Sequence, residues 1–237
     1  MDIIIVTAFD RISSVNACLE HLSRCDSIDD FEVWLSEDTH QGAHEYTIPA
    51  FKNFRHIKPD VKNSRENWIA AMKLAYETDA GYVHIIEDDI NVGENYLSWT
   101  RLAHETFQPF VTFGTNVLTE YGTDPSAVAV SHSDFASWAM CIRRQDLIVS
   151  IERPDMHPEE SIHNSLIEDK RLAVWPLMPR AFNTGLPSPR FHTGTFGGPA
   201  TSLHVACDRR SLWQQAYKAQ ARWGTFTTRI RISRAKR

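Results

Sequence analysis

The chain has 237 residues and a net charge of −5, and 42% of its residues are hydrophobic and 23% charged. These values are ordinary for a globular protein that consists of one large domain, or of one domain with a small appendage. No apolar run approaches the roughly 20 residues that a membrane helix needs, and the first residues lack the basic segment of a signal peptide.

The first half of the chain alternates strand and helix patterns, which predicts parallel strands with helices on both faces of the sheet. Strands are expected at Ile3–Ala8, Phe31–Leu35, Phe54–Ile57 and Tyr82–Glu87. Helices are expected at Ser13–Ser23, His40–Phe51 and Arg65–Glu77. Ser13 or Ser14 is the expected N-cap of the first helix, because serine oxygens accept hydrogen bonds from the free N–H groups of a first turn.

The second half is less regular. Helices are expected at Asn95–Phe107, Gln145–Ile151 and Pro158–Lys170, and strands at Val111–Gly114, Val128–Val130 and Ser137–Arg143. Proline and glycine dominate residues 176–199, which is typical of a long functional loop.

The C-terminal residues 222–237 carry six basic groups and no acid. The other 221 residues, with 19 basic and 30 acidic groups, therefore sum to −11. Such a tail is typical of a segment that binds a polyanion, and equally of a solvated terminus. A third interpretation is a strand that covers a sheet edge, because Arg229-Ile230-Arg231-Ile232 alternates polar and apolar residues.

Three consecutive acids, Glu87, Asp88 and Asp89, end the apolar run that begins at Tyr82. The carboxyl end of a buried strand is where an open α/β sheet binds its ligand. Hard divalent cations bind carboxylate oxygens and leave positions open for substrate phosphates. The pattern indicates a metal–diphosphate site, and the alternative is a solvated acidic turn.

Two other strand ends carry candidate nucleotide ligands. Arg11 follows the first strand, where a cation suits a nucleotide phosphate or base. Glu37 and Asp38 end the second strand, where a carboxylate either accepts the imino N–H of a pyrimidine or stabilises the start of a helix. Glycine-rich phosphate loops are missing, which argues against a Rossmann oxidoreductase, a P-loop ATPase and, less strongly, a nucleotidyltransferase.

Two further residues are candidates for chemistry. Glu160, next to Glu159 at an expected helix start, is either a general base or a charge that complements the helix dipole. His192 lies in the Pro/Gly-rich loop. A lone loop histidine is more often structural, yet imidazole also suits a metal ligand beside a carboxylate.

These motifs together resemble the GT-A fold glycosyltransferases, most closely the N-acetylglucosaminyltransferase I type (glycosyltransferase family 13-like). The similar segments occur in the family's order at residues 4–11, 35–42, 56–60 with 67–75, 85–93, 158–160 and 188–194. The Glu-Asp-Asp of residues 87–89 is similar to the family's metal motif and is the strongest single match. The resemblance implies one GT-A-like α/β domain with a mixed, mostly parallel sheet flanked by helices.

The resemblance also implies a division of that domain and a reaction. Residues 1–93 would form the nucleotide-sugar-binding half, 94–210 the acceptor half, and 211–237 a C-terminal helix with the basic tail. The implied enzyme is a metal-dependent, inverting hexosyl- or N-acetylhexosaminyltransferase that uses a nucleotide diphosphate sugar, with UDP expected. Asp89 and His192 would bind Mn²⁺ or Mg²⁺, Glu160 would be the base, and the nucleotide ligands would be Arg11, Asp38, Glu87 and Asp88.

The chain also departs from that family. It lacks the membrane anchor and stem of the Golgi enzymes, its base is glutamate rather than aspartate, and residues 112–140 match weakly. The acceptor is therefore open: a saccharide, a lipid-linked glycan, a metabolite, or a hydroxymethylated base in DNA that the basic tail would help to bind. Non-catalytic glycan or nucleotide binding, and nucleotidyl transfer, are the rival functions.

The cysteines bear on the expected location of the protein. Cys18, Cys25, Cys141 and Cys207 show no paired metal spacing, so we expect reduced thiols. With no anchor expected, the sequence predicts a cytoplasmic protein, bacterial or phage-encoded, with no membrane partner.

Overall fold

The computed structural model describes residues 1–9, 11–38, 44–61, 63–115, 128–132, 138–176, 179–183 and 228–230. The strands are β1 (Asp2–Ala8), β2 (Phe31–Glu37), β3 (Phe54–Ile57), β4 (Tyr82–Glu87), β5 (Ile90–Val92), β6 (Val111–Phe113), β7 (Val128–Ser131), β8 (Met140–Arg143), β9 (Ala173–Pro176), β10 (Ala181–Asn183) and β11 (Thr228–Ile230). The α-helices are α1 (Ile12–Ser23), α2 (Ser64–Tyr76), α3 (Tyr96–Phe107), α4 (Ile148–Ile151) and α5 (Pro158–Glu168), and the 3-10 turns are η1 (Ile28–Asp30) and η3 (Arg144–Leu147).

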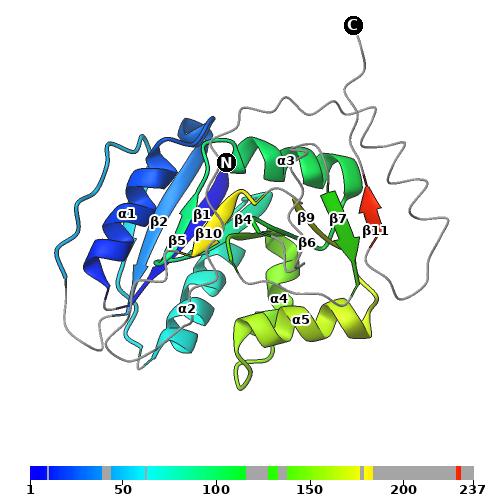
Figure 1. Cartoon of the computed structure of the whole chain (residues 1–237). Coiled ribbons are helices and arrows are strands. Elements are labelled where there is room, and N and C mark those ends of the chain that lie inside the picture. The colour runs from blue at the N-terminus through cyan, green and yellow to red at the C-terminus, as the bar shows by residue number, and fades with distance from the viewer. Residues whose placement is uncertain are drawn as a thin grey trace, which may run out of the picture.

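Nine of these strands form one sheet in the order β11-β7-β9-β6-β8-β4-β1-β2-β3 (Figure 1). In this sheet β7 and β8 run opposite to the other seven strands. β5 and β10 form a separate antiparallel pair. The expected α/β fold with a mixed, mostly parallel sheet flanked by helices is therefore confirmed.

The register of the central strands sets the position of the site. Ala8 of β1 pairs with Glu37 of β2, and Thr7 pairs with Glu87 of β4. All three strands are parallel and end at nearly the same level. The residues that follow them therefore meet at one edge of the sheet.

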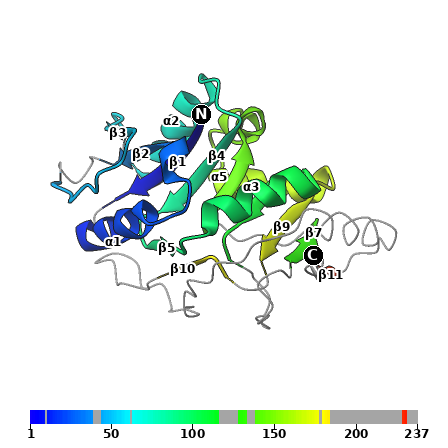
Figure 2. The same cartoon turned by 90° about the horizontal axis from the view of Figure 1, so that it is seen from above.

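The two faces of the sheet bury separate cores because successive strand residues point to opposite sides. Ile3 and Ile5 of β1 pack with α2 and α5, and Ile4 and Val6 pack with α1 and α3. Figure 2 shows the helices on either side of the sheet. The apolar stripes predicted for these helices are the buried ones, as at Val15, Leu19 and Leu22.

Several local predictions are wrong. Residues 44–51 are not helical. The cap of α1 is also wrong: α1 begins at Ile12 with Arg11 in the N-cap position and no side-chain cap, while Ser14 is buried inside the helix. The short strands β5, β9 and β10 were not predicted, because three or four residues carry too little periodicity.

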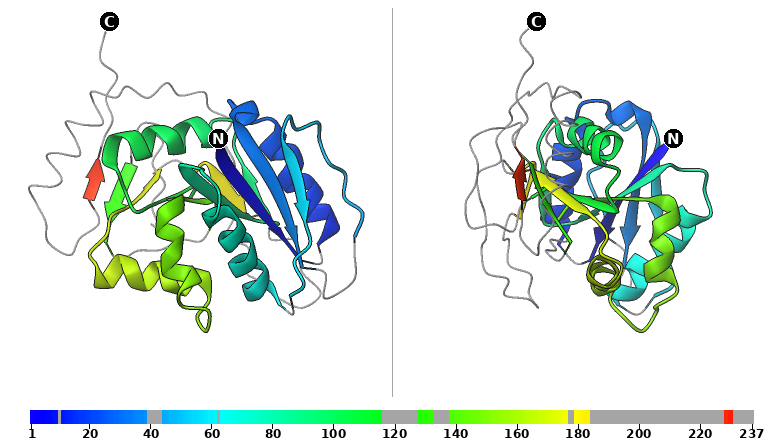
Figure 3. Two further views of the ribbon diagram at one scale, coloured as in Figure 1. Left: turned by 180° about the vertical axis from the view of Figure 1, so that it is seen from behind. Right: turned by 90° about the vertical axis from the view of Figure 1, so that its right-hand side faces the viewer.

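Part of the C-terminal tail belongs to the sheet. β11 pairs antiparallel with β7, with Thr228 opposite Val130, and the two strands lie side by side in Figure 3. This pairing favours the interpretation of the tail as a sheet edge. The helix expected in 211–237 lies outside the described residues. Among the helices that the structure does describe, none combines the length and apolarity needed to span a bilayer.

Candidate functional site

Asp88 and Asp89 form the turn between β4 and β5, at the sheet edge where β1 also ends. Their side chains are buried, with residue exposures of 2% and 4%. Arg11, three residues beyond β1, donates from Nη1 to Asp89 Oδ2 at 2.7 Å and from Nη2 to Asp88 Oδ1. The backbone N–H of Phe9 donates to Asp88 Oδ2 at 3.2 Å. The end of β1 therefore supplies a cation and an amide to the acids that follow β4.

Burial dominates the electrostatics of this pair. It raises the pKa of Asp88 to about 6, while Arg11 lowers that pKa and Asp89 raises it. With both carboxylates ionised, one guanidinium leaves the group with one excess negative charge. Such a group attracts a further cation, and it is costly to bury without one.

A third segment of the chain also contacts Asp89. Asn183 of β10 lies opposite Ile90 of β5, and its Nδ2 donates to Asp89 Oδ2 at 3.1 Å. β10 is held in place by Gly114, whose carbonyl accepts from Ala181 N at 2.9 Å. A Cβ on Gly114 would lie only 2.7 Å from the Cβ of Ala181, so this approach requires glycine. Sequence reasoning missed Asn183, because β10 has no detectable pattern.

Glu37, the last residue of β2, is a fully buried carboxylate with hydrogen-bond donors on both oxygens. Oε1 accepts from His44 N at 2.8 Å and from Tyr46 OH at 3.2 Å, and Oε2 accepts from Lys58 Nζ at 3.1 Å and from His56 Nε2 at 3.0 Å. Burial alone would raise the pKa of Glu37, but the hydrogen bonds from His44 and Lys58 outweigh it and lower the pKa. Glu37 therefore anchors residues 44–46 to the ends of β2 and β3. It does not have the alternative role of stabilising the start of a helix.

Asp38 follows Glu37 and is also fully buried. Its backbone N–H donates to Ala8 O at 2.9 Å, which continues the β1–β2 pairing by one residue. Asp38 thus lies on the same sheet edge as the acidic pair, with the end of β1 between them. Glu87 ends β4 and is partly buried.

The structure brings together some of the predicted residues and leaves others apart. Arg11, Asp88 and Asp89 form one hydrogen-bonded group. Glu160 is exposed in the first turn of α5, and the hydrogen bonds of the described residues do not join it to that group. His192 lies outside the described residues. Within the part of the chain that the structure describes, no three side chains are arranged as a complete metal site.

The sequence matches no protein-family model and no curated protein sequence. Among solved structures, the chain is similar to S. aureus TarS with a TM-score of 0.52 and 10% identity over 74% of this chain and 35% of TarS. It is also similar to TarS residues 1–349 in complex with UDP, with a TM-score of 0.51 and 12% identity over 73% of this chain and 57% of that one. TarS is a glycosyltransferase of the GT-A type.

The chain has the GT-A fold. At 10–12% identity this likeness concerns the fold alone. The chain spans about a third of TarS, and just over half of its 1–349 fragment. The closer resemblance to the N-acetylglucosaminyltransferase I type stays a prediction. Within the GT-A fold, the acidic pair and Arg11 lie at the carboxyl ends of parallel strands, where such sheets bind ligands.

Proposed function

We propose that this chain is a glycosyltransferase that moves a hexosyl or N-acetylhexosaminyl group from a nucleotide diphosphate sugar, UDP-sugar in particular, to an acceptor hydroxyl. One observation carries the proposal: Asp88 and Asp89 are paired with Arg11 at the ligand-binding edge of a GT-A fold. The TarS fragment of the same fold is described in complex with UDP, which supports a nucleotide donor.

We propose Mn²⁺ or Mg²⁺ as the cofactor of this site, because carboxylate oxygens are the ligands that hard divalent cations prefer. Both oxygens of Asp88 already accept hydrogen bonds, from Arg11 and from Phe9 N, so Asp89 is the stronger candidate of the pair. Protein ligands alone are too few among the described residues, which fits an ion that takes its remaining ligands from substrate phosphates. We propose Asp89 as the principal ligand, with His192 as a second. When bound, such an ion neutralises charge on the leaving diphosphate.

The chain's own residues would divide the remaining work. Arg11 holds Asp88 and Asp89 in fixed positions through its planar guanidinium. Asp38 would accept the imino N–H of uracil at the neighbouring strand end. Glu160 would take the proton from the acceptor hydroxyl as it attacks the anomeric carbon, and a direct displacement of this kind inverts the configuration.

A donor-by-acceptor screen followed by mass spectrometry tests this function. UDP-sugars and Mn²⁺ would be offered with saccharides, small hydroxylated metabolites and DNA that contains hydroxymethylated bases. A mass increase of one sugar on any acceptor, absent in Asp89→Asn, is the expected result. Donor binding without transfer would favour a non-catalytic binding module, and transfer of UMP with release of a sugar 1-phosphate would favour a nucleotidyltransferase.

Replacing Asp38 by asparagine should weaken the preference for UDP. A hydrogen bond to a charged group contributes about 1.5–3 kcal/mol, so UDP should bind roughly 10- to 100-fold less tightly. Calorimetry with UDP, GDP and ADP in the presence of Mn²⁺ measures this. Asp29→Asn makes the same change at an exposed position and should have no effect. Equal affinities of the unaltered protein for the three nucleotides would remove Asp38 from base recognition.

Replacing Glu160 by glutamine should lower turnover by roughly 10²- to 10⁴-fold, the usual contribution of a general base. UDP affinity should stay the same, because the base acts mainly in the transition state. Glu159→Gln is the matched control, since Glu159 lies in the same helical turn and contacts His157. If Glu160 only complements the helix dipole, its change would cost about 0.3–1 kcal/mol of stability and leave the rate intact.

Truncation after Tyr217 separates the interpretations of the basic tail. Loss of β11 uncovers the edge of β7, so we expect a lower melting temperature together with loss of every activity. If the tail serves a DNA acceptor instead, the truncated protein should stay folded and lose only DNA binding. The slope of log affinity against log salt would then flatten by about 0.9 per lost phosphate contact. Thermal melts and salt-dependent DNA binding distinguish the two.

A further inference from the structure

A cavity of about 270 Å³ lies at the opposite edge of the sheet from the acidic pair. Its wall includes Asp2 and Tyr82, which are the first residues of β1 and β4, the two strands whose other ends carry the proposed nucleotide site. An apolar cavity of about 150 Å³ is already large enough to bind benzene. This cavity therefore has room for a compact aromatic molecule, and nothing in the proposed sugar transfer uses it.

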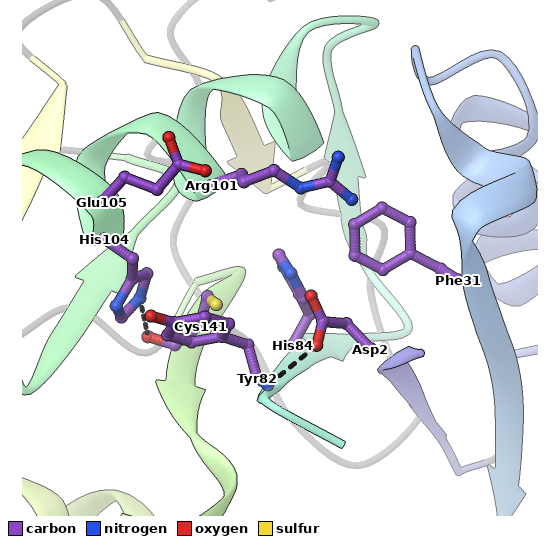
Figure 4. Close-up of a pocket in the computed structure, with 8 residues that line it drawn as sticks. All are labelled: Asp2, Phe31, Tyr82, His84, Arg101, His104, Glu105 and Cys141. Carbon is purple, nitrogen blue, oxygen red and sulfur yellow. Dashed lines mark hydrogen bonds between the residues drawn. The ribbon is translucent and has the colours of Figure 1, made fainter. Parts of the chain in front are cut away.

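The floor of the cavity differs in character from its mouth. The floor consists of buried side chains, each at most 2% exposed, namely Phe31, His84, His104 and Cys141. Phe31 meets His84 edge-on, with ring centroids 5.4 Å apart. Arg101 and Glu105 are exposed and extend from α3 above these rings, as Figure 4 shows. A bound molecule would meet aromatic rings at the floor and charged groups only on the side that faces water.

The charged residues of the wall already have partners. Asp2 Oδ1 accepts two backbone N–H groups around the start of β4, at 3.2 and 3.0 Å. The Arg101 guanidinium lies over the ring of Phe31 and is paired with Asp30 at 3.4 Å. Glu105 also has an interaction of its own. An ionic guest would therefore lose hydration without gaining a counter-charge from these side chains, which favours a neutral guest.

The tautomer of His84 is fixed by a hydrogen-bond chain behind the floor. Tyr96 donates its hydroxyl proton to Ala139 O at 3.1 Å. Because the hydroxyl has a single proton, its oxygen accepts from His84 Nδ1, which is 3.1 Å away. The proton of neutral His84 is therefore on Nδ1, and Nε2 carries a lone pair. Burial, with smaller contributions from His104 and Arg101, lowers the pKa of His84 to about 3 and keeps it neutral.

The lone pair on His84 Nε2 is the polar feature of the floor that a guest can use. Nε2 accepts no hydrogen bond from the residues that the structure describes. It is not among the enclosed unpaired atoms of those residues, so a molecule in the cavity can reach it. His104 differs, because its Nε2 donates to Cys141 O at 3.2 Å and its Nδ1 is enclosed. His104 thus contributes only its ring, and the floor presents one accessible imidazole acceptor.

We propose that this cavity binds a small neutral aromatic molecule with a single O–H or N–H donor, of the phenol or indole class. The donor would reach His84 Nε2, and the ring would lie against Phe31, Tyr82 and His104 in the offset or edge-on arrangements that aromatic pairs prefer. A purely apolar ring would leave the lone pair of Nε2 unsatisfied, and a carboxylate would bring it no proton. The site is separate from the nucleotide site, because the two lie at opposite ends of β1 and β4.

Titration of the full chain with phenol and with toluene tests this proposal. The two molecules have nearly the same shape, and only phenol carries a donor. Imidazole ¹⁵N resonances report directly on whether a ring nitrogen accepts a hydrogen bond. Phenol should shift the Nε2 resonance of His84 saturably in the sense of hydrogen-bond acceptance, and toluene should not. The shift should persist when the protein is saturated with UDP, so the result does not depend on the proposed sugar transfer.

Replacing His84 by phenylalanine keeps an aromatic ring in the floor and removes the acceptor. Tyr96 keeps Ala139 O as its own acceptor, so the change leaves no buried donor unpaired. The affinity for phenol relative to toluene should fall roughly two- to tenfold, the usual size of one neutral hydrogen bond. His21→Phe makes the same change on α1, outside the cavity wall, and should leave this ratio unchanged.

Three results would overturn the proposal. They are phenol binding that does not saturate, a His84 Nε2 resonance that stays in place at saturation, and the same ratio of phenol to toluene affinity in His84→Phe as in the unaltered protein. The first two are measured on the unaltered chain, so they decide the matter whether or not the variant folds.

Discussion

Asp89→Asn is expected to reduce sugar transfer by roughly 100- to 1,000-fold, because a catalytic metal ion contributes several kcal/mol and each 1.36 kcal/mol is a factor of ten. The substitution keeps the volume of the side chain and removes the charge that a cation needs. Asn183 and Arg11, which both contact Asp89 Oδ2, would still find an oxygen acceptor. Asp89→Asn should therefore lower the transfer rate and the metal affinity, and should change the stability of the fold only slightly.

Rate measurements across a Mn²⁺ titration check this result, with circular dichroism to verify folding. Asp79→Asn is the matched control, since Asp79 is an exposed aspartate just beyond α2. Full activity of Asp89→Asn in the presence of EDTA would contradict both the metal and the role of Asp89.

Arg11→Ala should destabilise the chain more than any other single change at the site. The substitution removes the guanidinium that two buried carboxylates share. Removing one partner of a buried ion pair lowers the free energy of unfolding by about 3–5 kcal/mol. Arg24→Ala is the control, because Arg24 pairs with Glu20 on the surface and exposed pairs contribute only about 0.2–1 kcal/mol. Urea unfolding of both variants gives the comparison.

The loss in Arg11→Ala should depend on pH in a definite direction. Burial already raises the pKa of Asp88 from 3.8 to about 6, and Arg11 opposes this rise together with the backbone N–H of Phe9. Without Arg11 the pKa rises further. A carboxyl whose pKa is raised by folding contributes stability at low pH, and that contribution is lost as the pH rises through the folded pKa. The variant should therefore be closest to the unaltered protein near pH 5 and furthest from it above pH 7.

A divalent cation should partly replace the missing guanidinium. At pH 7.5, Mn²⁺ should raise the melting temperature of Arg11→Ala more than that of the unaltered protein, because a ligand at 100 times its Kd adds about 2.7 kcal/mol. Equal losses of stability at pH 5 and pH 7.5, with no response to Mn²⁺, would mean that Arg11 contributes packing alone.

The strands at the site were the most predictable part of the fold. The bounds of β3 and β4 agree with the sequence prediction, and β4 is an apolar run that ends abruptly at acidic residues. The place of the Glu-Asp-Asp motif then follows from the position of β4, since the carboxyl ends of parallel strands share one edge of the sheet. Local sequence was sufficient to predict the strands whose bounds depend on which neighbouring residues are buried.

Long-range contacts decide the parts that sequence reasoning missed. Residues 44–46 are not helical, and His44 and Tyr46 donate to Glu37; no periodicity within the segment reveals that partner. Arg11 takes the N-cap position of α1, while its side chain contacts Asp88 and Asp89, which are 77 and 78 positions further along the chain. Asn183 contacts Asp89 across 94 positions. Single-sequence patterns describe neighbours along the chain, and these contacts join distant segments.

The separation of these segments also orders the assembly of the site during synthesis. Arg11 precedes the acids, so one of the two negative charges of Asp88 and Asp89 can be balanced as soon as β1 pairs with β4. Asn183 follows Asp89 by 94 residues, which a ribosome adds in roughly 5–20 s. A nascent chain could thus close its first parallel sheet with a cation already shared between the two acids, long before β10 arrives. The arginine would then act as a folding counter-ion first, and as part of the finished site only later.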